Sequence, residues 1–256
     1  MPYLTALFFV TAIVYASVGF GGGSTYNALL VLSGADFRVL PSVALSCNII
    51  VVTGGVWHFS RSGHLQLKLV LPFLALSVPM AWLGGRLPID ERLFVGLLGL
   101  SLAFAGLRLL LSRARDSVPT APPPAARMWA IGLPVGAAIG LLAGLVGVGG
   151  GIFLAPLLHV LHWGTARGIA AASSLFILIN SVSGLAGQIM KLGDIGQLGQ
   201  FYQYLWLFPA VLLGGQAGSL IGSRHLPGPL VRRLTAVVVL YVAGRLLIRW
   251  YTMGGA

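Results

Sequence analysis

A cluster of glycines inside an apolar segment occurs twice in this chain of 256 residues. The first cluster comprises Gly19 and Gly21–Gly23, and the second comprises Gly147 and Gly149–Gly151. The offset between them is 128 residues (147 − 19). Hydrophobic segments interrupted by glycine at matching positions of two halves are typical of the binding sites of membrane transporters. The sequence therefore predicts a duplicated membrane unit whose two glycine turns belong to one site.

The composition supports a membrane protein. Hydrophobic residues make up 57% of the chain and charged residues 8%, whereas a soluble domain carries about 25% charged residues. Several apolar runs approach the roughly 20 residues that a membrane-spanning helix needs. The net charge of +11 does not indicate nucleic-acid binding, because the basic residues flank apolar runs and form no continuous basic face. We therefore expect an all-α polytopic membrane protein in contact with the lipid bilayer, with no nucleic-acid partner.

The apolar segments fall into two sets of five. They lie near residues 3–19, 24–34, 42–58, 67–85 and 92–111, and then near 129–147, 152–162, 168–188, 203–222 and 230–250. Between the sets, Pro122, Pro123 and Pro124 favour an extended spacer. The predicted organisation is a first transmembrane repeat over 1–112, a Pro-rich linker over 113–128 and a second transmembrane repeat over 129–256.

The segments 24–34 and 152–162 are too short to cross a membrane, because about eleven residues reach only halfway across roughly 30 Å of hydrocarbon. Each is predicted to be a half-helix after a glycine turn, either re-entrant or part of a broken span. If the chain reverses there, each repeat has about four membrane segments plus the half-helix, and the two repeats are inverted.

The distribution of basic residues favours the inverted arrangement. With the reversal, ten of the 16 Lys and Arg residues gather on the linker side of the membrane and the remaining six (16 − 10) on the other. The ten are Arg61, Lys68, Arg108, Arg113, Arg115, Arg127, Arg167, Arg224, Arg232 and Arg233. The alternative of four simple spans in each half divides the same residues nine to seven. The positive-inside rule then predicts a cytoplasmic linker and periplasmic termini.

The glycine turns are the predicted anion site. A half-helix that follows such a turn presents unsatisfied N–H groups and the positive end of its dipole, which bind anions without a buried arginine. Ser24 is expected to cap the first half-helix. The candidate substrate-binding residues in these segments are Gly21, Gly22, Gly23, Ser24, Thr25, Asn27, Gly149, Gly150 and Gly151.

The next segment in each half adds a band of small polar residues. Ser46 and Asn48 in the first half, and Ser173 and Ser174 in the second, are further substrate-binding candidates. The alternative is that such groups simply bond a neighbouring helix. We favour that alternative for the other polar residues of these segments, which are Thr53, Asn180, Ser181 and Ser183.

The acidic residues argue against a proton relay inside the membrane. All five, Asp36, Asp90, Glu91, Asp116 and Asp194, fall in predicted loops, whereas proton-coupled pumps usually keep an ionisable group within the spans. The spans also contain no metal-ligand cluster and no pair of nucleophile and base, so no enzyme, metal site or cofactor is predicted. The single cysteine, Cys47, excludes an intrachain disulfide.

At its glycine turns the sequence resembles the TauE/SafE sulfite exporter family of bacterial membrane proteins. The resemblance rests on Gly19–Gly23, on Gly147–Pro156 and on Ala171–Phe176, and it extends over nearly the whole chain. It implies a multi-pass protein of the bacterial cytoplasmic (inner) membrane that transports a small organosulfur anion such as sulfite, sulfoacetate or another sulfonate. We expect export by alternating access. The alternatives are an anion channel and a proton-coupled uptake carrier for another small organic anion, and the oligomeric state stays open.

Overall fold

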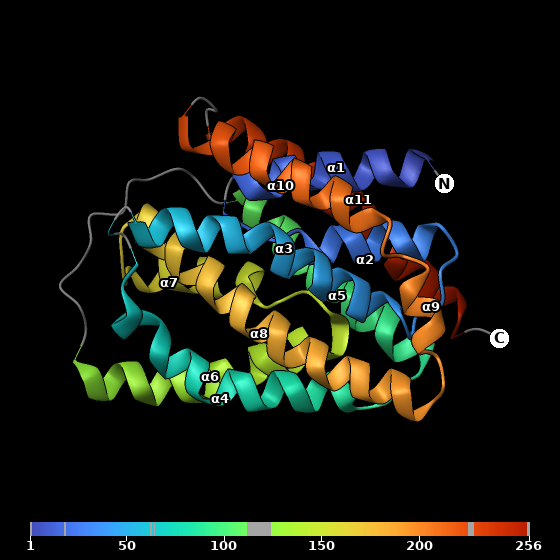
Figure 1. Ribbon diagram of the computed structural model, residues 1–256. Coiled ribbons are helices and arrows are strands. Elements are labelled where there is room, and N and C mark those ends of the chain that lie inside the picture. Colours follow the sequence, from blue (N-terminus) through green and yellow to red (C-terminus); the bar gives the residue numbers. More distant parts are fainter. Residues whose placement is uncertain are drawn as a thin grey trace.

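The computed structural model describes residues 2–17, 19–61, 63, 65–111, 124–224 and 228–254 as a bundle of α-helices without a strand (Figure 1). The helices of the first half are α1 (Pro2–Ser17), α2 (Gly23–Leu32), α3 (Leu40–Arg61), α4 (Leu67–Arg86) and α5 (Glu91–Leu111). Those of the second half are α6 (Ala125–Val146), α7 (Gly151–Leu161), α8 (Ala166–Asp194), α9 (Leu198–Tyr202), α10 (Leu207–Arg224) and α11 (Gly228–Thr252). The predicted all-α class is confirmed.

Four of the described helices are long and apolar enough to cross a membrane. They are Leu40–His58, Leu67–Arg86, Ala125–Val146 and Gly168–Asp194. The shorter Tyr3–Ser17 and Leu207–Leu220 are also apolar. Large apolar side chains such as Leu213, Val237 and Ile248 are exposed on the outside of the bundle, where lipid rather than water would solvate them. These features are those of a polytopic membrane protein.

One predicted boundary differs from the structure, and one short helix was not predicted. α6 begins at Ala125, inside the segment predicted to be the linker, because the ring of Pro124, its N-cap, fixes φ at −52° just before the first helical residue. Residues 112–123, which make up most of the predicted linker, lie outside the described residues. α9 was not predicted as a separate helix, because its five residues carry too short a pattern to separate from the apolar segment that follows.

The half-helices are present as short helices behind the glycine turns. α2 has 10 residues and α7 has 11, which correspond to about 15 Å of helix length. Figure 1 shows the chain doubling back at each turn, so that α2 runs against α1 and α7 runs against α6. The expectation that Ser24 caps α2 was wrong: the N-cap is Gly22, whose φ of 85° places it in the left-handed region that glycine adopts without strain.

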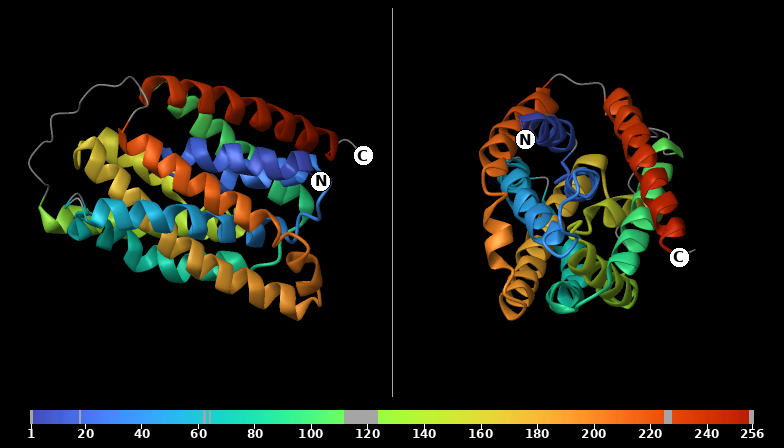
Figure 2. Two further views of the ribbon diagram at one scale, coloured as in Figure 1. Left: turned by 45° about the horizontal axis from the view of Figure 1, so that its top comes forward. Right: turned by 90° about the vertical axis from the view of Figure 1, so that its right-hand side faces the viewer.

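One helix of each half packs against the helices of the other half. α4 of the first half packs on α6 and α8 of the second, and α10 of the second half packs on α1 and α3 of the first. α5 and α11 pair along one side of the bundle, while α1 and α10 lie on the opposite side (Figure 2). This packing across the halves places α3 and α8, the helices that carry the predicted polar bands, in direct contact at the centre.

Glycines allow the closest of these contacts. A Cβ atom added at Gly136, Gly140 or Gly144 of α6 would overlap a backbone carbonyl oxygen of α4. Their spacing of four residues aligns them on one face of α6, so the α4–α6 contact is made backbone to backbone, as small residues permit between membrane helices. This close contact positions the C-terminal end of α6, where the second glycine turn begins.

Candidate anion site

Each glycine turn depends on left-handed backbone. Gly19 and Gly22 have φ angles of 82° and 85° in the first turn. In the second turn, Gly147, Gly149 and Gly150 have φ angles of 77°, 74° and 80°. A side chain in this region is strained by roughly 1–2 kcal/mol, so the sequence needs glycine here to reverse the chain within four or five residues.

The turns leave helix N-termini at the centre of the bundle. The first hydrogen bonds of α2 run from the N–H groups of Thr25 and Tyr26 to the carbonyl of Gly22, and those of α7 run from Phe153 and Leu154 to the carbonyl of Gly150. The N–H groups that precede them have no partner within their own helix and carry the positive end of its dipole. Two such ends on opposite halves can act together on one anion.

Asn48 of α3 lies between the two turns. A Cβ atom added at Gly21 would overlap the Asn48 carboxamide, and one added at Gly23 or Gly149 would lie 2.5 or 2.8 Å from Asn48 Nδ2. The Asn48 side chain is fully buried, and neither Nδ2 nor Oδ1 has a hydrogen-bond partner among the described residues. Three glycines from both halves therefore make room for one buried carboxamide.

Two serines of α8 border the second turn. A Cβ atom added at Gly149 would lie 2.9 Å from Ser181 Oγ, and one added at Gly151 would lie 3.3 Å from the backbone carbonyl oxygen of Ser173. Both serines are fully buried, and their hydroxyl groups lack hydrogen-bond partners among the described residues. We call Asn48, Ser173 and Ser181 the buried polar cluster.

Each glycine turn is also braced from the opposite half. Asn27 Nδ2 of α2 donates a hydrogen bond of 2.7 Å to the carbonyl of Val146, at the start of the second turn. Ser174 Oγ of α8 donates one of 2.7 Å to the carbonyl of Gly19 in the first turn. These two predicted site residues lie beside the turns, and the bonds that they make hold the turn backbones in place.

Thr25 and Ser46 bond groups outside the glycine turns. Thr25 shares a hydrogen bond of 2.7 Å with the hydroxyl of Tyr15, and the Ser46 hydroxyl donates to the carbonyl of Ser42 in its own helix at 2.9 Å. Ser24 is buried at the second position of α2.

The middle glycine of each turn faces the helix that precedes it. A Cβ atom at Gly22 would meet Tyr15 of α1, and one at Gly150 would meet Ile139 of α6. The structure thus brings Gly21, Gly23, Gly149 and Gly151 to the buried polar cluster and turns Gly22 and Gly150 away from it.

One face of α8 carries polar residues that were not predicted to border the second glycine turn. Ser181 was expected to serve helix packing, and Gln188, whose Nε2 donates a 2.7 Å hydrogen bond to the carbonyl of Gly144, was not singled out. Ser173, Ile177, Ser181 and Gln188 are spaced by four, four and seven residues, which places them on one face of a helix. That spacing was the available signal.

Comparisons with known proteins identify one family and one similar membrane protein. A family model described as "Sulfite exporter TauE/SafE" matches residues 4–246. The chain is 35% identical over 249 residues to "Probable membrane transporter protein y4hK" of Sinorhizobium fredii (strain NBRC 101917 / NGR234), and the match covers 95% of this chain and 97% of that protein. No solved structure matches the chain. The resemblance based on the glycine turns is confirmed.

Proposed function

Because this chain belongs to the TauE/SafE sulfite exporter family of membrane transporters, we propose that it exports a small organosulfur anion. The substrate class is sulfite, sulfoacetate or another sulfonate, and the membrane is the bacterial cytoplasmic membrane. The anion binds between the two glycine turns, and transport follows by alternating access.

The buried polar cluster is the observation that carries this proposal. A buried polar group without a hydrogen bond destabilises a protein by about 1–3 kcal/mol, yet the Asn48 carboxamide lies beside both turns and the Ser181 hydroxyl lies beside Gly149 without a partner. Ser173, which adjoins Gly151 through its backbone carbonyl, adds a further buried hydroxyl without a partner. The Asn48 amide and the two hydroxyl groups are donors, as are the first N–H groups of α2 and α7. A sulfonate or sulfite carries several acceptor oxygens and satisfies donors from both halves at once.

The absence of a cation in the cluster fits a carrier. An anion held by neutral donors and helix dipoles is bound without a fixed counter-charge, so it is released when the two turns separate. All three cluster residues are fully buried, so the site reaches water only when the helices around it move. Rocking of two repeats around a midplane site is the common mode of such transporters.

The packing of helices across the halves supports inverted repeats. In the duplicated unit, α1, α3 and α4 of the first half correspond to α6, α8 and α10 of the second. The contacts of α4 with α6 and α8 then correspond to contacts of α10 with α1 and α3, and all four contacts are present. Both termini lie at one end of the bundle, while α5 ends and α6 begins at the opposite end (Figure 1). These observations favour a two-fold axis in the membrane plane, with the linker cytoplasmic and both termini periplasmic.

The charge distribution favours outward movement driven by the membrane potential. Among the described acidic residues, Asp36 and Asp90 lie in loops, while Glu91 and Asp194 are terminal residues of their helices. The described spans therefore offer no carboxylate for proton coupling. Moving one negative charge outward releases about 2.3 kcal/mol per 100 mV, which is enough to drive export against a concentration gradient.

The test is charge displacement in proteoliposomes on a solid-supported membrane. The anions are sulfite, sulfoacetate, isethionate, taurine, sulfate, acetate and chloride, each over a range of concentrations and pH. We expect saturable currents confined to sulfite and the sulfonates. Currents that do not saturate and that occur with every anion would instead show a channel, and no current with any sulfur oxyanion would refute the substrate class.

Two variants connect the current to the site. Asn48→Leu keeps the branched shape and the number of heavy atoms of the side chain but removes the donor between the turns, so we expect it to abolish the sulfonate current. Ser46→Ala is the matched control on the same helix, because Ser46 bonds its own helix, and it should transport normally. Equal currents from Asn48→Leu and wild type would refute the site even if the substrate class is correct.

A further inference from the structure

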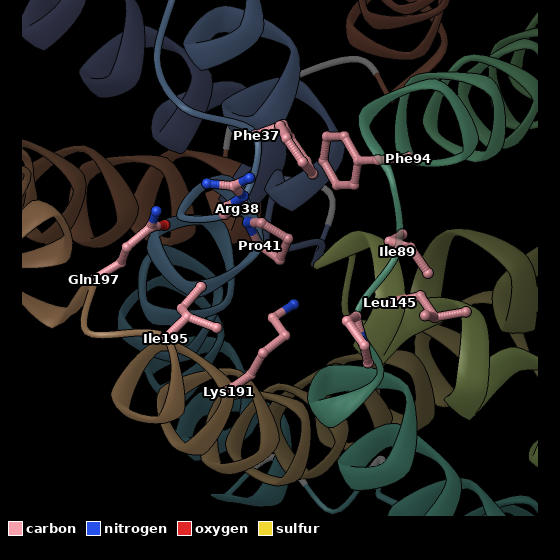
Figure 3. A pocket seen from close by; sticks show the side chains of 10 residues that line it. Phe37, Arg38, Pro41, Ile89, Phe94, Leu145, Lys191, Ile195 and Gln197 are labelled. Carbon is pink, nitrogen blue, oxygen red and sulfur yellow. The ribbon is translucent and has the colours of Figure 1, made fainter.

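A cavity of about 360 Å³ opens among three helix connections (Figure 3). These connections lie at the end of the bundle that carries both termini (Figure 1). The cavity is built by the α2–α3, α4–α5 and α8–α9 connections together with the ends of α3, α5, α6 and α8. Its volume lies within the roughly 300–1,000 Å³ typical of small-molecule sites.

The cavity is positively charged. Two of its described lining residues carry charge, and both are cations: Arg38 from the α2–α3 connection and Lys191 from the last turn of α8. Figure 3 shows Lys191 pointing its amino group into the ring of lining side chains. Within the described residues, no carboxylate oxygen lies within 4.0 Å of a side-chain nitrogen of either cation.

The nearby carboxylates have other partners. Asp194 pairs with Arg86 at 3.6 Å, and Glu91 pairs with Arg249 at 2.6 Å. Asp90 Oδ1 accepts a hydrogen bond from a backbone N–H of α5, and Asp36 Oδ1 accepts one from the backbone N–H of Arg38. No described carboxylate therefore neutralises Lys191 or Arg38, whose guanidinium carbon lies 5.4 Å from the centre of the Phe37 ring.

The rest of the lining is apolar. Phe37 and Phe94 pack with ring centroids 6.2 Å apart, and Ile89, Leu145 and Ile195 continue the wall. Gln197 adds one polar group, because its Oε1 is buried without a hydrogen-bond partner among the described residues. Two cations beside a hydrocarbon wall suit an anion with an apolar body better than a bare inorganic oxyanion, which would leave that wall without contact.

The cavity borders the backbone of the second glycine turn. Pro41 lines the cavity, and a Cβ atom added at Gly147 would lie 2.5 Å from Pro41 Cα. Leu145 lines the same cavity directly before Val146, whose carbonyl accepts the hydrogen bond from Asn27. The cavity is thus separated from the buried polar cluster by the turn that the anion must pass.

We propose that this cavity is a second anion site, a vestibule in which Arg38 and Lys191 hold the sulfonate group of a small organic sulfonate while the apolar wall contacts its hydrocarbon part. The role of the cavity in a transport path rests on the proposed function, whereas the binding of a sulfonate in the cavity does not depend on it. Such a site narrows the substrate class from sulfur oxyanions in general to sulfonates with a short carbon chain.

The binding test uses the Asn48→Leu variant as background, so that the buried site is disabled. Calorimetric titration of the purified variant with methanesulfonate, ethanesulfonate and propane-1-sulfonate should show one site. Each added methylene should tighten binding about fourfold as it is buried against the wall. Sulfite should bind more weakly than propane-1-sulfonate.

Charge variants locate that site. Lys191→Gln and Arg38→Gln, each added to Asn48→Leu, should weaken propane-1-sulfonate binding about tenfold or more, as expected for the loss of a charge-assisted hydrogen bond. Arg92→Gln is the matched control, because Arg92 lies at the same end of the bundle but does not line the cavity, and it should bind normally. Because two separate cavity variants are measured, misfolding of one of them would not by itself explain a loss of binding in both.

Failure of the vestibule is distinguishable from failure of the proposed function. If wild type transports sulfonates but neither Lys191→Gln nor Arg38→Gln weakens binding more than Arg92→Gln, the vestibule is refuted and the transporter stands. If binding depends on Lys191 and Arg38 while wild type transports no sulfonate, the vestibule stands and the proposed function fails.

Discussion

Three glycines with nearly the same φ angle allow the effect of backbone strain on stability to be measured separately from the effect of steric overlap. Gly34, Gly22 and Gly150 have φ angles of 80°, 85° and 80°. An added Cβ atom meets nothing within 4 Å at Gly34, approaches atoms at 3.3 Å at Gly22, and lies 2.8 Å from Ile139 Cγ2 and Phe176 Cε1 at Gly150. Replacing each with alanine imposes the same backbone strain but a different steric overlap.

The expected order of destabilisation follows from these distances. Left-handed alanine costs about 1–2 kcal/mol at all three positions. Gly34→Ala should lose only this amount, and Gly22→Ala slightly more, because its neighbours must yield by a few tenths of an ångström. Gly150→Ala should lose about 1–3 kcal/mol in addition, because buried side chains must shift to admit the methyl group.

Thermal unfolding in detergent measures the series. For a chain of this size, the additional 1–3 kcal/mol corresponds to a Tm about 2–12 °C lower for Gly150→Ala than for Gly34→Ala. Transport is measured in parallel, and Gly34→Ala should retain it, because Gly34 lies in the α2–α3 connection away from both turns. A Tm for Gly150→Ala equal to that of Gly34→Ala would refute the close packing behind the second turn.

Two further substitutions test how the halves are joined. Ser174→Ala leaves the carbonyl of Gly19 without its 2.7 Å hydrogen bond and should lower the free energy of unfolding by about 1–3 kcal/mol; unfolding in detergent that matches wild type would contradict the bracing. Gly140→Ala forces a methyl group against the Ser77 carbonyl in the α4–α6 contact and should lower Tm clearly. Gly244→Ala, which meets nothing within 4 Å in α11, should be neutral or stabilising by up to about 1 kcal/mol, and a similar Tm for both variants would contradict the contact.

The sequence predicted the elements well because their signals are local. Apolar runs and their lengths mark the spans, and the break at Gly21–Gly23 and Gly149–Gly151 marks the short helices. The cap of α2 was misjudged because serine is a common N-cap, whereas a left-handed Gly22 already occupies that position. Residue preference at a helix end could not reveal the φ angle that the chain reversal requires.

The details of the site depend on packing that a sequence does not display. Ser46 and Asn48 are two residues apart, and therefore about 200° apart around α3, so they cannot both face the turns. Which of them does so depends on how α3 docks against α8 in the other half. Ser181 was undervalued for the same reason, since its position beside Gly149 follows from the contact between α7 and α8.

The most direct test of the central claim is the position of a bound sulfonate. A crystal structure of the protein with bromomethanesulfonate, with the bromine located from its anomalous scattering, would show where the anion binds. We expect an anomalous peak beside the Asn48 carboxamide, between the N-termini of α2 and α7, and loss of this peak in Asn48→Leu. Bromine in the vestibule or on the surface alone, with none between the two glycine turns, would contradict the central claim.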